Sequence, residues 1–106
     1  MQIELQVFSG RPNPRWSVFG VQASDLIRRL RSLHVEANEM VAPGLGFHGF
    51  VIHYSGSRFC VYKLRVTVFR SKTKRVFQDT AGVEAFLVAQ ARSHGLDNLL
   101  PPIDQL

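Results

Sequence analysis

The run S-G-R-P-N-P-R-W at residues 9–16 combines residue types that recognise anions with residues that hold a backbone rigid. Each proline fixes its own φ at about −65° and biases the preceding residue toward extended conformations. A stiff loop of this kind presents Arg11 and Asn13 to a carboxylate, a phosphate or a peptide. Trp16 would supply an apolar platform beside them. The run therefore predicts a ligand-binding loop at Arg11, Asn13 and Trp16.

The same three residues also have a structural interpretation. Arg11 and Asn13 would hydrogen-bond neighbouring carbonyl groups that no strand pairing satisfies, because buried backbone groups must be paired. Trp16 would fill the core. The sequence leaves both interpretations open.

Other residues with catalytic or metal-binding chemistry form no recognisable site. Cys60 falls on the apolar side of a long alternating segment, which favours a buried thiol over a nucleophile. No pair of histidines has the spacing of a zinc site. The histidines are His34, His48, His53 and His94. The acidic residues assigned to expected helix caps and helix surfaces are Asp25, Asp79, Glu84 and Asp97.

Residues 44–49 match the dinucleotide pattern G-x-G-x-x-G, but a strand is expected where nucleotide binding needs a helix. We predict no catalytic residue, no metal and no cofactor. The sequence favours a small non-enzymatic binding or interaction domain. A small enzyme with its site at the proline loop stays open as an alternative.

The basic charge balance raises the question of an anionic partner. The chain carries a formal net charge of +5 and has a pI of about 10.2. Excess positive charge favours nucleic acid and other anionic surfaces in general. Lys63 and Arg65, with Phe59, Val61 and Phe69 on an open sheet face, would contact phosphates and stack bases. Nucleic-acid association through Lys63 and Arg65 is therefore an alternative function, although no ribonucleoprotein motif is present.

Two periodicities predict the elements that position these residues. Alternation of polar and apolar residues predicts strands at residues 2–7, 47–54, 58–70 and 75–78, with a short extended piece at 16–18. A helical period predicts helices at 21–33 and from about 83 to Gly95, the second capped by Asp79 or Thr80. Within 58–70, Cys60, Val66 and Val68 share one face, and Lys63 and Arg65 the other.

This order predicts an α+β fold: a mainly antiparallel sheet of about four strands with two helices on one face, a two-layer sandwich. The 106 residues, 45% of them hydrophobic, suit a single domain spanning 1–106. No apolar run is long enough to cross a bilayer and no export signal is recognised, so we expect a soluble, cytoplasmic protein that does not bind membranes. We expect the uncovered sheet face to meet solvent, a partner or a second copy of the chain. A protein or an anionic small ligand is the expected kind of partner, and a homodimer through the sheet face is a further alternative.

A resemblance covers a minor part of the chain. Residues 7–14 (V-F-S-G-R-P-N-P), Trp16, 43–46 (P-G-L-G) and 49–51 (G-F-V) resemble a group of small uncharacterised proteins that begin with the signature S-G-R-P-N-P-x-W. The resemblance implies no activity, cofactor or site residue.

Overall fold

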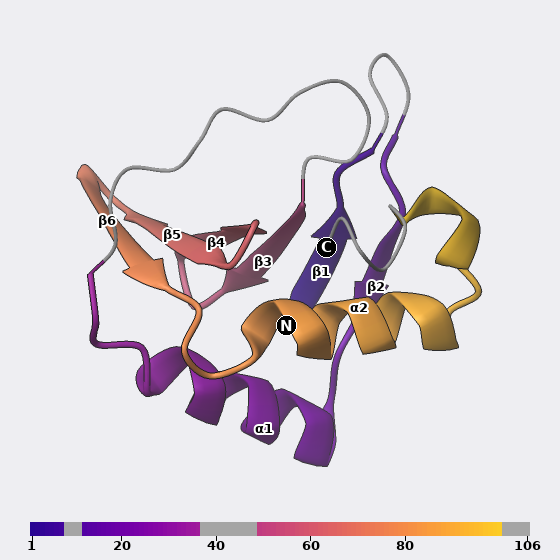
Figure 1. Cartoon of the computed structure of the whole chain (residues 1–106), viewed down its shortest axis with the longest axis horizontal. Helices are drawn as coiled ribbons and strands as arrows, with labels where there is room; N and C mark the ends of the chain where they lie inside the picture. Colours follow the sequence, from indigo (N-terminus) through magenta and orange to yellow (C-terminus); the bar gives the residue numbers. More distant parts are fainter. Residues whose placement is uncertain (8–11, 37–48, 101–106) are drawn as a thin grey trace.

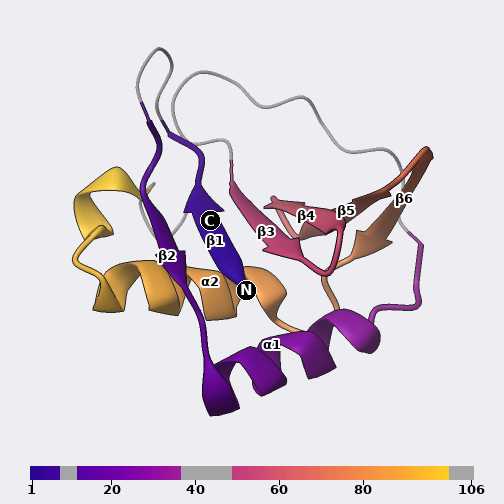
Figure 2. The ribbon, with the colours of Figure 1, turned by 180° about the vertical axis from the view of Figure 1, so that it is seen from behind.

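Six strands form one antiparallel sheet in the computed structural model, which describes residues 1–7, 12–36 and 49–100 (Figure 1). Across the sheet the strands follow the order β2 (Arg15–Ser17), β1 (Gln2–Leu5), β3 (Phe50–Tyr54), β4 (Ser57–Tyr62), β5 (Arg65–Arg70) and β6 (Thr73–Gln78). Figure 2 shows β2 at one edge and β6 at the other.

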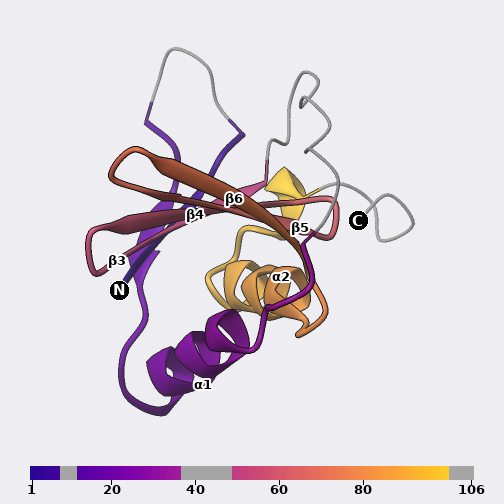
Figure 3. The same ribbon diagram turned by 90° about the vertical axis from the view of Figure 1, so that its left-hand side faces the viewer.

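Two helices, α1 (Gly20–Arg31) and α2 (Val83–Ser93), cover one face of this sheet, and a short 3-10 turn, η1 (Asp97–Leu99), follows α2. Seen along the sheet, both helices lie on the same side (Figure 3). The predicted α+β fold with an antiparallel sheet and two helices is confirmed. The predicted number of about four strands is wrong, because the sheet has six.

The number of strands differs mainly because residues 58–70 form a hairpin of β4 and β5 in place of one long strand. Lys63 and Leu64 make the two-residue turn between them, with φ angles of 47° and 61°. Turns of this kind usually contain glycine, asparagine or aspartate, since those residues tolerate positive φ. Neither residue is of that type, so the sequence carries no turn signal there.

The turn also changes which residues share a face. Cys60 lies opposite Thr67 in the register, and Val61 lies opposite Val66. Side chains alternate along a strand, so a two-residue turn breaks the continuous period-two pattern that one strand would have had. The prediction that Cys60 shares the apolar face with Val66 and Val68 is therefore wrong.

The core lies between the sheet and the helices. Its fully buried side chains include Ile3 and Leu5 of β1, Phe50 and Ile52 of β3, and Leu26 of α1. These positions follow the predicted alternation in β1 and β3 and the predicted stripe in α1. The periodic signal is reliable here because the large apolar side chains of each element gather on the face that meets the core, although Glu4 and Val51 on the other sheet face are also buried.

Polar side chains fix both helices. Arg28 and Arg29 form ion pairs with Asp25, and Arg29 Nη1 also donates to the Ala81 carbonyl at 2.7 Å, just before α2. The Asp79 carboxylate accepts hydrogen bonds from the backbone N–H groups of Val83 and Glu84 at 2.8 and 2.7 Å. Asp79 therefore satisfies the free N–H groups of the first turn of α2, as predicted, but the N-cap position itself is Gly82 and not Asp79 or Thr80.

Residues 34–36, which follow the first predicted helix, contact the edge strand β6. Glu36 forms an isolated antiparallel bridge with Phe77, its carboxylate pairs with Arg75, and the Val35 carbonyl accepts the Gln78 N–H at 3.0 Å. The G-x-G-x-x-G run falls outside the described residues except for Gly49.

Candidate functional site

Asn13 closes the hairpin of β1 and β2. Its Oδ1 accepts the Val7 backbone N–H at 3.0 Å, and its Nδ2 donates to Glu4 Oε2 at 3.1 Å. The Pro14 carbonyl accepts the Leu5 N–H at 3.0 Å, so backbone pairing with β1 extends one residue before the start of β2. These two hydrogen bonds engage both ends of the Asn13 amide, which supports its structural interpretation. Arg11 lies outside the described residues.

The partner of Asn13, Glu4, is a carboxylate on the sheet face opposite the helices. It is only 8% exposed, and its oxygens contact Arg15 Nη2 at 3.1 Å, Gln6 Nε2 at 3.4 Å and His53 Nε2 at 3.5 Å. Burial alone would raise the pKa of Glu4, but the hydrogen bond from Asn13, the Arg15 charge and the contacts with His53 and Gln6 together lower it. Glu4 is therefore an ionised anchor for the loop.

We expect Asn13→Ala to lower the free energy of unfolding by about 1–2 kcal/mol at neutral pH, because it leaves the Val7 N–H without its acceptor and removes one hydrogen-bond donor to Glu4. The lowered pKa of Glu4 stabilises the fold above the ordinary glutamate pKa of about 4.3, and that contribution is lost as the pH falls through the folded value. The difference between the variant and the wild type should therefore shrink in acid. Urea unfolding between pH 3 and pH 7 measures this, and a constant difference would contradict the role of Glu4.

Trp16 points away from Asn13, into the core. It is 8% exposed, lies opposite Ile3 in the register, and its ring centroid is 5.2 Å from that of His94 after α2. Asn13 contacts Glu4 on the other face of the sheet. The structure does not bring Asn13 and Trp16 together as one binding surface.

The residues of the predicted nucleic-acid surface are also divided. Lys63 lies in the turn after β4, with its Nζ 5.6 Å from the Tyr62 ring centroid. Arg65 begins β5, where it lies opposite Tyr62 in the register and faces away from the helices. Phe59 packs with the core and Val61 is fully buried in it, so both lie on the helix-covered face and neither belongs to the uncovered sheet face.

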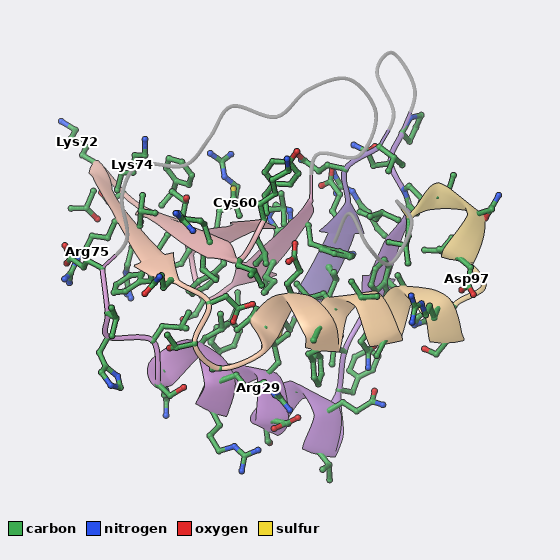
Figure 4. All side chains as sticks on the ribbon, in the orientation of Figure 1. Arg29, Cys60, Lys72, Lys74, Arg75 and Asp97 are labelled. Atoms are coloured by element: carbon green, nitrogen blue, oxygen red, sulfur yellow. The ribbon has the colours of Figure 1, made fainter. Side chains whose placement is uncertain are left out.

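Phe69 does lie on the uncovered face, but its ring is occupied by Arg58, whose Cζ is 4.8 Å from the centroid. Cys60 lies on the same face and is half-buried (Figure 4). Burial raises the pKa of the Cys60 thiol and outweighs the lowering effect of the adjacent Arg58. A thiol with a raised pKa is a poor nucleophile at neutral pH.

A cleft at one end of the sheet brings together two arginines that the sequence did not associate. α1 contributes Arg31, Ile27 and Leu30, and the sheet contributes Phe59 of β4 and Arg70 at the end of β5. The hollow between them has a volume of about 240 Å³. We call it the arginine cleft.

Three residues with hydroxyl groups also line the cleft. Tyr54 ends β3 and Ser57 begins β4, and both line the arginine cleft together with Ser55 in the turn between them. Within the described residues these hydroxyls have no hydrogen-bond partner, so they are available to a ligand or to water. Tyr54 also lines a neighbouring hollow on α1, which shares Arg31 and Ile27.

The charge in the arginine cleft has no counter-charge. Four of the nine described arginines pair with carboxylates: Arg15 with Glu4, Arg28 and Arg29 with Asp25, and Arg75 with Glu36. Among the other five, Arg58, Arg65 and Arg92 have no carboxylate partner in the described part of the chain and do not line the cleft. Arg31 and Arg70 have no acidic partner within residues 1–7, 12–36 and 49–100, and no acidic residue lines the cleft. In the sequence Arg31 reads as part of an exposed helix face and Arg70 as part of a basic hairpin tip, so no local signal connects them.

Figure 4 shows the rest of that hairpin tip, where Lys72, Lys74 and Arg75 lie around the turn between β5 and β6. Arg29 lies elsewhere, between α1 and α2. No cluster of three or more histidine, cysteine or acidic side chains suited to a metal ion occurs in the described part of the chain.

Fold and site together define a small α+β domain with one uncovered sheet face and a basic cleft at the end of its helical layer. Comparison with protein-family models, curated proteins and solved structures found no match. The resemblance to proteins with the S-G-R-P-N-P-x-W signature therefore stays a prediction. None of the described helices has the length and apolar character needed to cross a membrane.

Proposed function

We propose that the protein is a small non-enzymatic binding domain that takes an anionic ligand in the arginine cleft. The observation that carries this proposal is the convergence of Arg31 and Arg70 on one hollow without an acidic partner. Guanidinium groups bind carboxylates and phosphates through paired, charge-assisted hydrogen bonds. An anion in the cleft would satisfy both arginines at once.

Helix electrostatics account for only part of this arrangement. Arg31 lies in the last turn of α1, where the helix dipole favours a cation by about 0.3–1 kcal/mol. Arg70 lies at the end of a strand and has no such reason to point toward the same hollow. Two cations that share a space repel each other unless water or an anion screens them.

The roles of the acidic groups support binding over catalysis. The carboxylates of Glu4 and Asp79 accept backbone or loop hydrogen bonds that hold the fold, and the Glu84 carboxylate accepts the N–H groups of Lys63 and Leu64. General acid–base catalysis needs a carboxylate that can reach a substrate. These groups are engaged within the fold, which favours the non-enzymatic proposal over an enzyme at the proline loop.

The earlier alternatives have weaker support. A site at the proline loop would rest on Arg11, because Asn13 and Trp16 are engaged with the fold. Nucleic-acid binding would rest on Arg65 and on charge, because Phe59 and Val61 face the helices. A ligand in the arginine cleft would leave the contacts of Asn13 and Trp16 with the rest of the fold in place.

Titration with inorganic phosphate, followed by backbone amide NMR shifts, tests the proposal. We expect saturable shifts at Leu30, Arg31, Ser57 and Arg70. Arg31→Gln or Arg70→Gln should each weaken binding by about tenfold or more, since a hydrogen bond to a charged group contributes about 1.5–3 kcal/mol. The matched control is Arg92→Gln, which removes an exposed arginine from the last turn of α2 and should leave the affinity unchanged.

Rising salt should weaken phosphate binding, because the attraction is partly exposed to solvent and is screened. Shifts spread evenly over all exposed arginines would contradict the proposal. So would equal losses of affinity in the Arg70→Gln and Arg92→Gln variants.

A further inference from the structure

We propose that the anionic ligand carries an apolar group of about the size of one ring, so that the arginine cleft selects aryl carboxylates or aryl phosphate monoesters over the bare anion. This inference rests on the proposed function and specifies its ligand class. It is drawn from the lining of the cleft, its volume and the separation of its polar and apolar residues.

The lining of the cleft is apolar on the side nearest the core. Leu30 and Phe59 pack against the core while remaining partly exposed, and Ile27 lies one helical turn before Leu30 on the same side of α1. Covering such a surface releases water from it. The binding free energy that a ligand gains in this way is proportional to the apolar area it covers. A bare phosphate would leave this surface uncovered.

The volume suits a ring with one acidic group. A dry cavity of about 150 Å³ holds a benzene molecule in a protein core. The arginine cleft, at about 240 Å³, has room for that ring and for a carboxylate or phosphate beside it. A bare anion would fill only a fraction of this space.

The polar groups would fix the orientation of such a ligand. Arg31 and Arg70 supply the cationic groups, and the Tyr54 and Ser57 hydroxyls supply hydrogen bonds that the described residues do not already use. A few placed polar groups on an otherwise apolar lining are typical of small-molecule sites. The acidic group would lie at the arginines and the ring against Leu30 and Phe59.

Four probes separate the contributions: phenyl phosphate, methyl phosphate, inorganic phosphate and benzamide, which has the ring but no charge. We expect phenyl phosphate to bind at least about tenfold more tightly than methyl phosphate, because only the former covers the apolar lining. Benzamide should bind more weakly than phenyl phosphate by a similar factor. Intermolecular NOEs should connect the phenyl protons with the Ile27 and Leu30 methyl groups.

Ile27→Ala tests the apolar lining without removing a residue of the buried core. It should reduce the preference for phenyl over methyl phosphate by severalfold and leave methyl phosphate affinity unchanged. Arg70→Gln should weaken both phosphate esters equally. If Ile27→Ala does not fold, the NOEs in the wild-type protein still decide the position of the ring.

The outcomes distinguish this inference from the proposed function. Equal affinities for phenyl and methyl phosphate, or NOEs from the ring to residues outside the cleft, would overturn the ligand class and leave anion binding intact. Failure of all three phosphates to bind would overturn both. Benzamide binding as tightly as phenyl phosphate would show that charge does not select the ligand, and would also overturn the inference.

Discussion

Replacing Gly49 by alanine is expected to lower the free energy of unfolding by about 3 kcal/mol or more. Gly49 immediately precedes β3 and has a φ of +93°, which side-chain-bearing residues rarely adopt. A Cβ atom there would lie 2.1 Å from the Val61 carbonyl oxygen of β4. That contact is with backbone, so relief would require β3 and β4 to separate. Urea unfolding followed by Trp16 fluorescence measures the loss.

Gly56→Ala is the matched control. Gly56 also has a positive φ, +76°, in the turn between β3 and β4, but a Cβ atom there would meet nothing within 4 Å. The variant should cost only the backbone strain, about 1–2 kcal/mol. The difference between the two variants isolates the close approach of the strands. Equal losses would show that the contact between Gly49 and Val61 can relax and would contradict the prediction.

Glu84→Ala should lower the free energy of unfolding by about 2–4 kcal/mol. The Glu84 carboxylate is buried at the start of α2 and accepts the N–H groups of Lys63 at 3.1 Å and Leu64 at 3.3 Å. Alanine would leave two backbone donors of a strained turn without these acceptors, and each unsatisfied group costs about 1–3 kcal/mol. Amide hydrogen exchange should show the turn opening before the rest of the sheet.

Glu84→Gln separates the hydrogen bonds from the charge. The single side-chain oxygen of glutamine can accept one of the two N–H groups. At acidic pH the free energy of unfolding of Glu84→Gln should therefore lie between those of the wild type and Glu84→Ala. Burial raises the pKa of Glu84, and the nearby Asp79 charge raises it further, against the lowering effect of the Leu64 and Lys63 hydrogen bonds. A raised folded pKa means that folding favours the protonated form.

The stabilisation linked to this raised pKa is complete below the unfolded glutamate value and is lost as the pH rises through the folded value. The glutamine variant has no such titration. The wild type should therefore lose stability relative to Glu84→Gln as the pH rises from 3 to 7. A stability difference independent of pH would show that Glu84 has an ordinary pKa in the folded protein.

The role of Glu84 explains where prediction from the sequence failed. Lys63 and Leu64 adopt positive φ although neither has a local preference for it. Their N–H groups are held by a carboxylate that follows β5 and β6 in the chain. A turn selected by a distant side chain leaves no pattern near itself. The sequence therefore predicts one long strand, which places Cys60 on the wrong face and Lys63 in a strand although it lies in a turn.

The candidate site was predictable only in part. The sequence indicated that residues 9–16 were unusual, and Asn13 and Trp16 do have specific partners. Alternation along a strand tells which sheet face a residue lies on only when the bounds of the strand are known. The sequence therefore did not show that Asn13 and Trp16 reach opposite faces of the sheet. The structural role of Asn13 depends on Glu4, whose burial on the uncovered sheet face is not visible in a polar-apolar pattern.

The sequence by itself determined the α+β class, the two helices and the buried faces of β1, β3 and α1, because these follow from local periodicity and from the burial of one side of each element. Only the tertiary structure decided the break between β4 and β5 and the cleft that Arg31 and Arg70 both line. Both depend on groups from separate elements that approach through space. Such contacts arise when the hydrophobic core fixes how the elements pack, and no period along the chain encodes them.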